Sequence, residues 1–126
     1  MTPSAAVHGT IFFAHGSRDP LWRQSIEAVA TYARQLEPQA LVRCAYLELS
    51  TPTLPACVAE LAAAGVQSIT VVPMFLGVGK HAREDLPVLI SDLRASYPQI
   101  DFVLKIAIGE DVRLIELMAR IALSRT

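Results

Sequence analysis

The strongest constraint on the fold of this chain is a fourfold alternation of short apolar runs with amphipathic helical patterns. The first run, Thr10–Ala14, is closed by His-Gly-Ser, which is typical of a buried strand followed by a turn. Three further runs, Leu41–Leu47, Ser68–Pro73 and Asp101–Ile106, repeat the arrangement. Because the runs are mostly apolar at their centres, they predict strands that are covered on both faces. Four such units predict an α/β fold with a parallel sheet.

A helical pattern follows each predicted strand. The first begins at Asp19-Pro20, a cap residue and a proline at the first helical position, and ends before Pro38. The second begins at Thr51-Pro52 and ends at Gly65, and the third ends before Pro98. The residues expected to face the core share helical spacing: Trp22, Ile26, Val29, Ala33 and Leu36; Leu54, Cys57, Val58, Leu61 and Ala62; Leu86, Leu89, Ile90, Leu93 and Tyr97; and Leu114, Ile115, Met118, Ile121 and Ala122.

Right-handed crossovers between parallel strands leave few topologies. We predict a three-layer, flavodoxin-like fold with a four-stranded parallel sheet of order 2-1-3-4 and helices on both faces. We expect one domain over residues 1–126, with its core over about residues 9–122. In this order the first and third strands lie side by side at the switch point. Open parallel sheets bind ligands there, outside the carboxyl ends of the strands.

Composition excludes several classes of protein. Hydrophobic residues make up 52% and charged residues 18% of the chain, which excludes intrinsic disorder. The net charge is −1 and no basic stripe is visible, so we expect no nucleic-acid partner. We find neither a long apolar span nor a secretory leader, so we expect no membrane partner. The isolated cysteines, Cys44 and Cys57, lack a metal-binding spacing and favour a reduced, cytoplasmic setting.

Two of the three histidines follow strands that are predicted to be neighbours. His15 comes after the first strand, His81 lies in the loop after the third, and Glu48 follows the second. Two imidazoles with a carboxylate suit a divalent transition metal such as cobalt, nickel, iron or zinc. Each residue taken singly also fits a structural role, as a capping or hydrogen-bonding group. His8 precedes the first strand, at the opposite edge of the sheet, and is not expected to act.

Basic side chains lie at the same edge of the predicted sheet. Arg18, Lys80 and Arg83 suit pairing with an acidic ligand, and solvated surface charge is their ordinary role. The segment Gly77–Lys80 contains two glycines and a lysine, as some phosphate-binding loops do. It lacks the spacing of the ATP-binding motif, so we expect no ATP site.

The segments Ala14–Pro20, Tyr46–Glu48, Val71–Leu76 and Lys80–Pro87 resemble those of the CbiX-type small sirohydrochlorin cobaltochelatases. These are short members of the class II tetrapyrrole chelatases. The resemblance runs over nearly the whole chain. It depends on the combination of HGSRDP with the later motif PxFLxxGxHxxEDxP, because either motif alone is much less specific.

The resemblance implies insertion of Co²⁺, or of Fe²⁺ or Ni²⁺, into sirohydrochlorin without ATP or an organic cofactor, in cobalamin or siroheme biosynthesis. It implies that His15 and His81 are catalytic and bind the metal, and that Glu48 completes the metal site. Single-length members associate in pairs, so a homodimer is expected, with the last predicted helix as a candidate contact. Five residues at the edge are expected to bind the tetrapyrrole: Ser17, Arg18, Gly79, Lys80 and Arg83.

Two positions depart from the family pattern, and two other functions stay open. Arg23 stands near where many relatives carry asparagine, and Lys80 replaces a small residue, which bears on metal preference and rate. A non-catalytic tetrapyrrole or metal carrier would keep the same fold and ligands. A histidine phosphatase also places His-Gly after its first strand, but it needs an arginine where this chain has Ala14.

Overall fold

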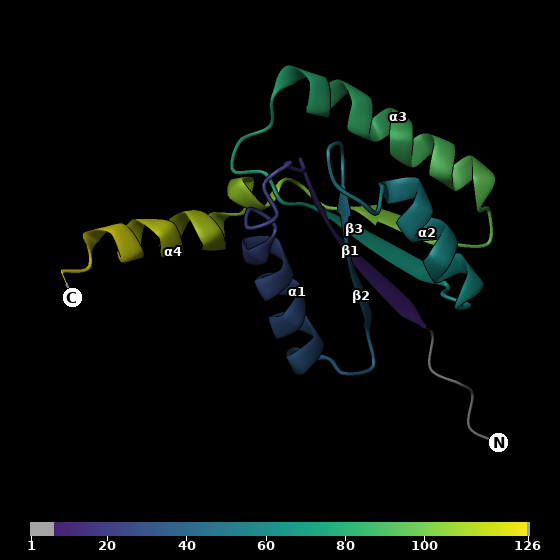
Figure 1. Cartoon of the computed structure of the whole chain (residues 1–126), viewed down its shortest axis with the longest axis horizontal. Helices are drawn as coiled ribbons and strands as arrows, with labels where there is room; N and C mark the ends of the chain where they lie inside the picture. The colour runs from purple at the N-terminus through teal and green to yellow at the C-terminus, as the bar shows by residue number, and fades with distance from the viewer. Residues whose placement is uncertain (1–6, 126) are drawn as a thin grey trace.

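The computed structural model describes residues 7–125, which contain a parallel sheet of order β2-β1-β3-β4 (Figure 1). Its strands are β1 (His8–Ala14), β2 (Leu41–Tyr46), β3 (Ser68–Pro73) and β4 (Asp101–Leu104). The predicted fold class and strand order are confirmed. Because β1 lies between β2 and β3 in parallel register, the carboxyl ends of all three strands meet at one edge of the sheet.

The helices divide unevenly between the two faces of the sheet. They are α1 (Gln24–Leu36), α2 (Leu54–Ala63), α3 (Lys80–Ser96) and α4 (Val112–Leu123), and a short 3₁₀ turn, η1 (Ile108–Glu110), precedes α4. In Figure 1, α2 and α3 lie on one face and α1 lies on the other. None of the helices in the described part of the chain is long and apolar enough to span a membrane.

The main hydrophobic core lies between the sheet and the α2–α3 layer. Alternate strand residues such as Ile11 and Val71 point to this layer, where Leu61 of α2 and Ile90 of α3 contribute to the same buried cluster. The predicted core faces of α2 and α3 are therefore confirmed. α2 begins later than predicted, because its cap is Thr53, whose hydroxyl accepts a hydrogen bond from the Ala56 amide.

The start of α1 was predicted wrongly. The carboxylate of Asp19 accepts a hydrogen bond from the Leu21 amide at 2.9 Å, and its carbonyl accepts one from the Trp22 amide at 3.1 Å. These bonds close a turn, and the helix itself begins only at Gln24. Asp19 is thus a capping residue of a turn that leads into the helix.

The core face of α1 is confirmed only in part. Ala30 is buried and Ile26 and Ala33 are half-buried, but Val29 is 41% and Leu36 is 68% exposed. Helical spacing identifies the apolar face of a helix but not the surface that covers it. Val29 and Leu36 are exposed because the sheet covers only one flank of this helix.

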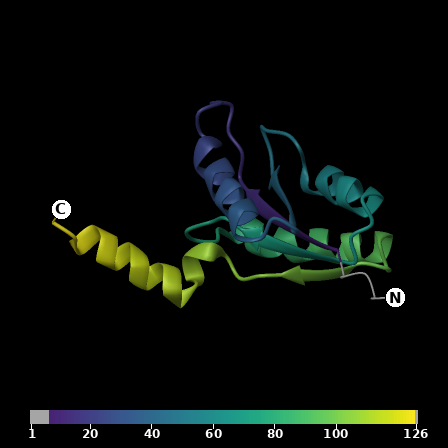
Figure 2. The ribbon, with the colours of Figure 1, turned by 90° about the horizontal axis from the view of Figure 1, so that it is seen from below.

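α4 forms where it was predicted, but it contributes nothing to the core of the described residues. Its cap is Asp111, whose side chain accepts a hydrogen bond from the Arg113 amide at 2.8 Å. Figure 2 shows that the helix projects away from the sheet instead of returning across it. The residues predicted to be buried are exposed or half-buried: Leu114, Ile115, Met118, Ile121 and Ala122.

Candidate functional site

Backbone hydrogen bonds extend the pairing of β1 beyond the ends of the strands. The Leu47 amide donates to the Ala14 carbonyl and the Glu48 amide donates to the His15 carbonyl, both at 2.9 Å. On the other side of β1, the Met74 amide donates to the Phe13 carbonyl at 2.7 Å. The backbone that carries His15 is therefore fixed from both neighbouring strands.

A close backbone contact and a buried hydroxyl join the loops after β1 and β2. Gly16 has a φ of 101°, and a Cβ at this position would overlap the carbonyl oxygen of Glu48. The buried hydroxyl of Ser50 accepts a hydrogen bond from the Ser17 amide at 3.2 Å and donates one to the Ser17 carbonyl at 2.9 Å. Only glycine combines this conformation with this contact at low cost, so Gly16 sets the spacing between the two loops.

An aromatic contact supports the His15 side chain. Its ring lies over Phe75 with the centroids 4.2 Å apart and the planes at 32°, and the imidazole remains exposed. Phe75 is itself buried and makes an edge contact with Phe13, with the centroids 6.1 Å apart. The imidazole thus rests on a buried part of the core and stays exposed at the surface.

His81 lies in the first turn of α3 and not in the loop where it was predicted. The helix begins at Lys80 after the cap residue Gly79, and the Arg83 amide donates to the Gly79 carbonyl at 3.0 Å. Pro87 also lies inside this helix. A helical position restricts the directions of the exposed His81 side chain more than a loop would.

Phe75 connects the two histidine-bearing regions. It lines a mostly apolar pocket of about 200 Å³ together with Ala82 and Leu86 of α3. It also lines a neighbouring pocket of about 270 Å³, to which Arg83 contributes. Sequence reasoning did not assign a role to Phe75, although its position directly after β3, next to β1, was a usable signal.

The three predicted metal ligands do not form a compact cluster. Among the residues that the structure describes, no three His, Cys, Asp or Glu side chains lie close enough together to hold a metal ion. Glu48 follows β2 and His81 lies in α3, which follows β3, and β1 lies between these two strands in the sheet. The structure brings His15 next to Glu48 through the backbone and next to α3 through Phe75.

The predicted substrate-binding residues differ in how far they are already engaged. Arg18 is exposed, and the Lys80 ammonium lies 4.0 Å from the Glu84 carboxylate in an exposed pair. The Ser17 hydroxyl accepts a hydrogen bond from the Asp19 amide at 3.0 Å, so it stabilises its own loop. At Gly79 a Cβ would meet nothing within 4 Å, so close packing does not require glycine there.

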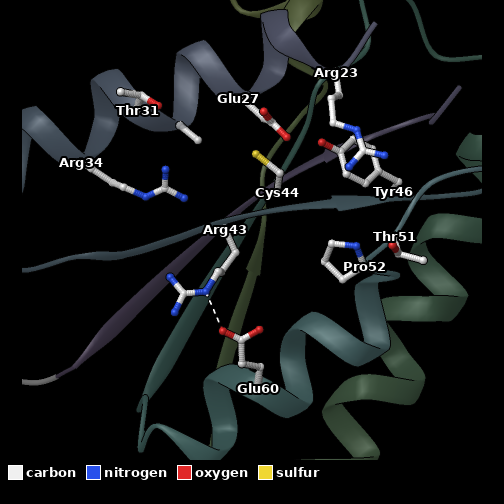
Figure 3. Close-up of a pocket in the computed structure, with 11 residues that line it drawn as sticks. Arg23, Glu27, Thr31, Arg34, Arg43, Cys44, Tyr46, Thr51, Pro52 and Glu60 are labelled. Atoms are coloured by element: carbon white, nitrogen blue, oxygen red, sulfur yellow. Dashed lines mark hydrogen bonds and ion pairs between the residues drawn. The ribbon is translucent and has the colours of Figure 1, made fainter. Parts of the chain in front are cut away.

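A larger hollow, of about 470 Å³, lies beside the exposed edge of β2 (Figure 3). Its cations already have partners: Arg43 pairs with Glu60 at 2.9 Å, Arg34 donates to a backbone carbonyl, and Arg23 lies over the ring of Tyr46. Burial raises the pKa of the Cys44 thiol at this hollow. A thiol kept neutral in this way is a poor metal ligand, so the histidine edge remains the candidate site.

The fold and the edge define a class: an α/β protein that presents two histidines at the switch point of a parallel sheet. Residues 9–123 match the CbiX family model, and the chain belongs to the CbiX family. Its predicted family resemblance is thus confirmed.

Solved structures agree with this assignment. The crystal structure of a putative cobalamin biosynthesis CbiX protein from Marinobacter aquaeolei aligns with a TM-score of 0.80 at 33% identity, over 91% of this chain and 93% of that one. SirB from Bacillus subtilis, a sirohydrochlorin chelatase crystallised with cobalt, aligns with a TM-score of 0.76 at 24% identity, over 90% of this chain and 49% of SirB. At that identity the likeness to SirB shows the fold alone.

Curated relatives carry the name sirohydrochlorin cobaltochelatase. The protein from Methanopyrus kandleri is 36% identical over 80 residues, which are 64% of this chain and 56% of that protein. The protein from Saccharolobus solfataricus is 29% identical over 119 residues, which are 89% and 91% of the two chains. The matched region thus spans little more than half of the Methanopyrus protein.

The contact between Gly16 and Glu48 makes a testable prediction. Gly16→Ala should lower the free energy of unfolding by more than about 1 kcal/mol, because the new methyl group meets a backbone carbonyl and the φ is positive. Urea unfolding followed by circular dichroism measures the change. Gly77→Ala is the matched control at the same edge, since a Cβ there meets nothing within 4 Å. Equal costs for the two variants would contradict this role of Gly16.

Proposed function

We propose that this protein is a chelatase that inserts a divalent metal, preferentially Co²⁺ and alternatively Fe²⁺, into sirohydrochlorin without ATP. The observation that carries the proposal is the placement of His15 over Phe75, which lines a pocket together with residues of α3, the helix that bears His81 in its first turn. Membership of the CbiX family and the names of the curated relatives support the same reaction.

The reaction exchanges one metal dication for two pyrrole N–H protons. The ion must shed water, and the protons must be received as the pyrrole nitrogens bind it. Neutral imidazoles suit both tasks, because they coordinate transition metals and titrate near neutral pH. His15 and His81 would hold the ion through few protein ligands and leave its other positions for water and pyrrole nitrogens. Such a ligand set suits a metal that is a substrate and has to leave.

Glu48 is assigned a supporting role. Its amide is bonded to the His15 carbonyl, which keeps its backbone next to that of the histidine. An exposed carboxylate in this position offsets part of the positive charge of the incoming ion without completing a closed coordination shell. A closed shell would hold the metal as a structural ion.

Cationic side chains around this edge are assigned to the carboxylates of the macrocycle. Arg18 and Arg83 belong to the two elements that carry the histidines, and Lys80 directly precedes His81. The Lys80–Glu84 pair is exposed and contributes little stability, so a substrate carboxylate can replace Glu84 as the partner of the lysine. Ser17 and Gly79 would act through their backbones, which position the two histidine-bearing segments.

The working unit is proposed to be a homodimer in the cytoplasm. One chain supplies a single wall beside the histidines, whereas a site that buries most of a flat macrocycle needs material on both sides. A second copy related by a two-fold axis supplies the other wall. The two free cysteines, Cys44 and Cys57, fit a reducing compartment.

Replacement of both histidines tests the reaction. His15→Ala/His81→Ala should reduce the rate of metal insertion by about a hundredfold or more, because it removes the metal ligands and the proton acceptors together. Purified protein is mixed with sirohydrochlorin and Co²⁺ or Fe²⁺, and insertion is followed by the visible spectrum.

His8→Ala is the matched control for this experiment. His8 lies at the opposite end of β1, where its ring is hydrogen-bonded to Ser68 at 2.6 Å and to Thr70 at 3.2 Å. This variant should turn over like the parent protein. A double variant with unchanged activity would show that His15 and His81 do not belong to the active site. If the parent protein binds metal and sirohydrochlorin stoichiometrically without repeated turnover, it is a carrier and not an enzyme.

The proposed anchors make a separate prediction. Arg18→Gln and Arg83→Gln should each raise KM for sirohydrochlorin about two- to fivefold and change kcat less. Exposed ion pairs to the substrate stabilise the bound substrate and the transition state about equally, so their loss affects mainly KM. Arg125→Gln, at an exposed position beyond α4, is the control. Steady-state kinetics at fixed metal concentration measure the effect. An unchanged KM in both variants would show that the two arginines are ordinary surface charges and do not bind the substrate.

The proposed homodimer predicts the mass of the particle. Sedimentation at micromolar concentration should give about twice the 13.7 kDa of one chain. Activity per chain should fall when the protein is diluted into the range where the monomer dominates. A monomeric protein with full turnover would contradict the two-walled site.

A further inference from the structure

The two flanks of α3 face different strands of the sheet. Asp85 lines the pocket of about 200 Å³, which extends to Leu47 directly after β2. Arg83 lines the pocket of about 270 Å³, which extends to Leu104 at the end of β4. Leu86, between the two flanks, is buried and lines both pockets. The Asp85 flank of α3 therefore faces the ends of β1 and β2, whereas the Arg83 flank faces the end of β4.

Helical spacing places His81 on the same flank as Asp85. Residues four apart in a helix differ in direction by only about 40° and lie one turn apart, with their Cβ atoms about 5–6 Å from each other. Arg83 follows His81 by two residues, so it points to nearly the opposite side of the helix. His81 therefore lies on the flank that faces the two strands whose ends lead to His15 and Glu48.

The Asp85 carboxylate has no structural task in its own chain. Among the described residues that line the 200 Å³ pocket, Asp85 alone is charged, and Phe75, which supports the His15 ring, lines the same pocket. Within residues 7–125 its carboxylate forms no hydrogen bond or ion pair, whereas the neighbouring Glu84 pairs with Lys80. The carboxylate is therefore free to accept a hydrogen bond from a group at this edge of the sheet.

We propose that Asp85 is a positioning residue for the metal-binding histidine of α3. When His81 binds the incoming ion through one ring nitrogen, the Asp85 carboxylate accepts a hydrogen bond from the other ring N–H. Histidines that bind metals commonly donate their second N–H to a carboxylate, which fixes the tautomer and the ring orientation and makes the coordinating nitrogen a better ligand. This inference deepens the proposed function, because it rests on His81 as a ligand of the metal.

The two histidines are then oriented by different means. The His15 ring is held by packing, because it lies over Phe75 with the centroids 4.2 Å apart. His81 is exposed, and it lacks an aromatic contact of this kind among the described residues. An exposed imidazole samples several rotamers, and fixing it in one of them costs conformational entropy. A hydrogen bond to Asp85 selects the rotamers that keep the ring on the flank facing His15.

Binding of Co²⁺ to the whole protein, without sirohydrochlorin, tests this role. Asp85→Ala should weaken Co²⁺ binding about tenfold, because it removes the acceptor that orients His81. Asp92→Ala is the matched control, since Asp92 is exposed and lies on the same flank of α3 two turns further along. This control should bind Co²⁺ like the parent protein. Isothermal titration calorimetry measures the affinities, and equal affinities of the two variants would overturn the proposal.

A double-mutant cycle separates positioning from direct binding of the ion. If Asp85 acts through His81, Asp85→Ala should change the Co²⁺ affinity less than about twofold in a His81→Ala background, because the residue it orients is gone. A tenfold loss that persists in this background would show that Asp85 binds or attracts the ion by itself, and it would overturn the positioning role.

Nuclear magnetic resonance of the His81 ring gives a measurement that a merely structural role would not change. Long-range correlations between ring protons and ring nitrogens report the tautomer, and Asp85→Ala should shift the His81 tautomer populations while Asp92→Ala leaves them as in the parent. An unchanged His81 spectrum would contradict the proposal. A parent protein that shows the Asp85-dependent Co²⁺ affinity but does not insert the metal into sirohydrochlorin would contradict only the proposed function.

Discussion

The parallel pairing of β1 with both β2 and β3 is the interaction on which the rest of this structure depends. It places three strand ends at one edge, and it continues into the loops through the amides of Leu47, Glu48 and Met74. Backbone hydrogen bonds of this kind leave the loops little freedom. The position of His15 therefore follows from the sheet itself and does not require contacts among the exposed side chains of the edge.

A second constraint acts through side chains, and it divides the edge into rigid and adaptable parts. Phe75 is buried, supports the His15 ring and lines pockets that α3 completes. Glu48, His81 and Arg18 are exposed, and among the described residues Glu48 and His81 do not form a compact set of metal ligands with His15. The proposed metal insertion would benefit from this division, because a rigid support orients one ligand while an open shell allows the ion to leave.

The two faces of the sheet differ in how their apolar surface is covered. On the α2–α3 face, Leu61, Ile90 and Val71 belong to one buried cluster, and sequence periodicity matches burial within the chain. On the α1 face, Val29 and Leu36 keep the same periodicity but remain exposed, as do the apolar residues of α4. An apolar pattern predicts that a surface is buried, but it does not identify whether the same chain or another chain covers that surface.

The amino-acid sequence by itself determined the strands, their order and the edge at which His15 and His81 lie, because apolar runs and crossover geometry are local or nearly local properties. It also determined the core residues of α2 and α3, such as Leu61 and Ile90, from helical spacing. Only the tertiary structure decided that Phe75 supports His15, that His81 lies in a helix, and that His15, Glu48 and His81 do not form a compact ligand cluster. The tertiary structure also decided that α4 projects away from its own sheet. The direction of a helix depends on the contacts of the segment that precedes it, here the contact of Gly109 with Leu76, and the periodicity of a sequence carries no information about such contacts.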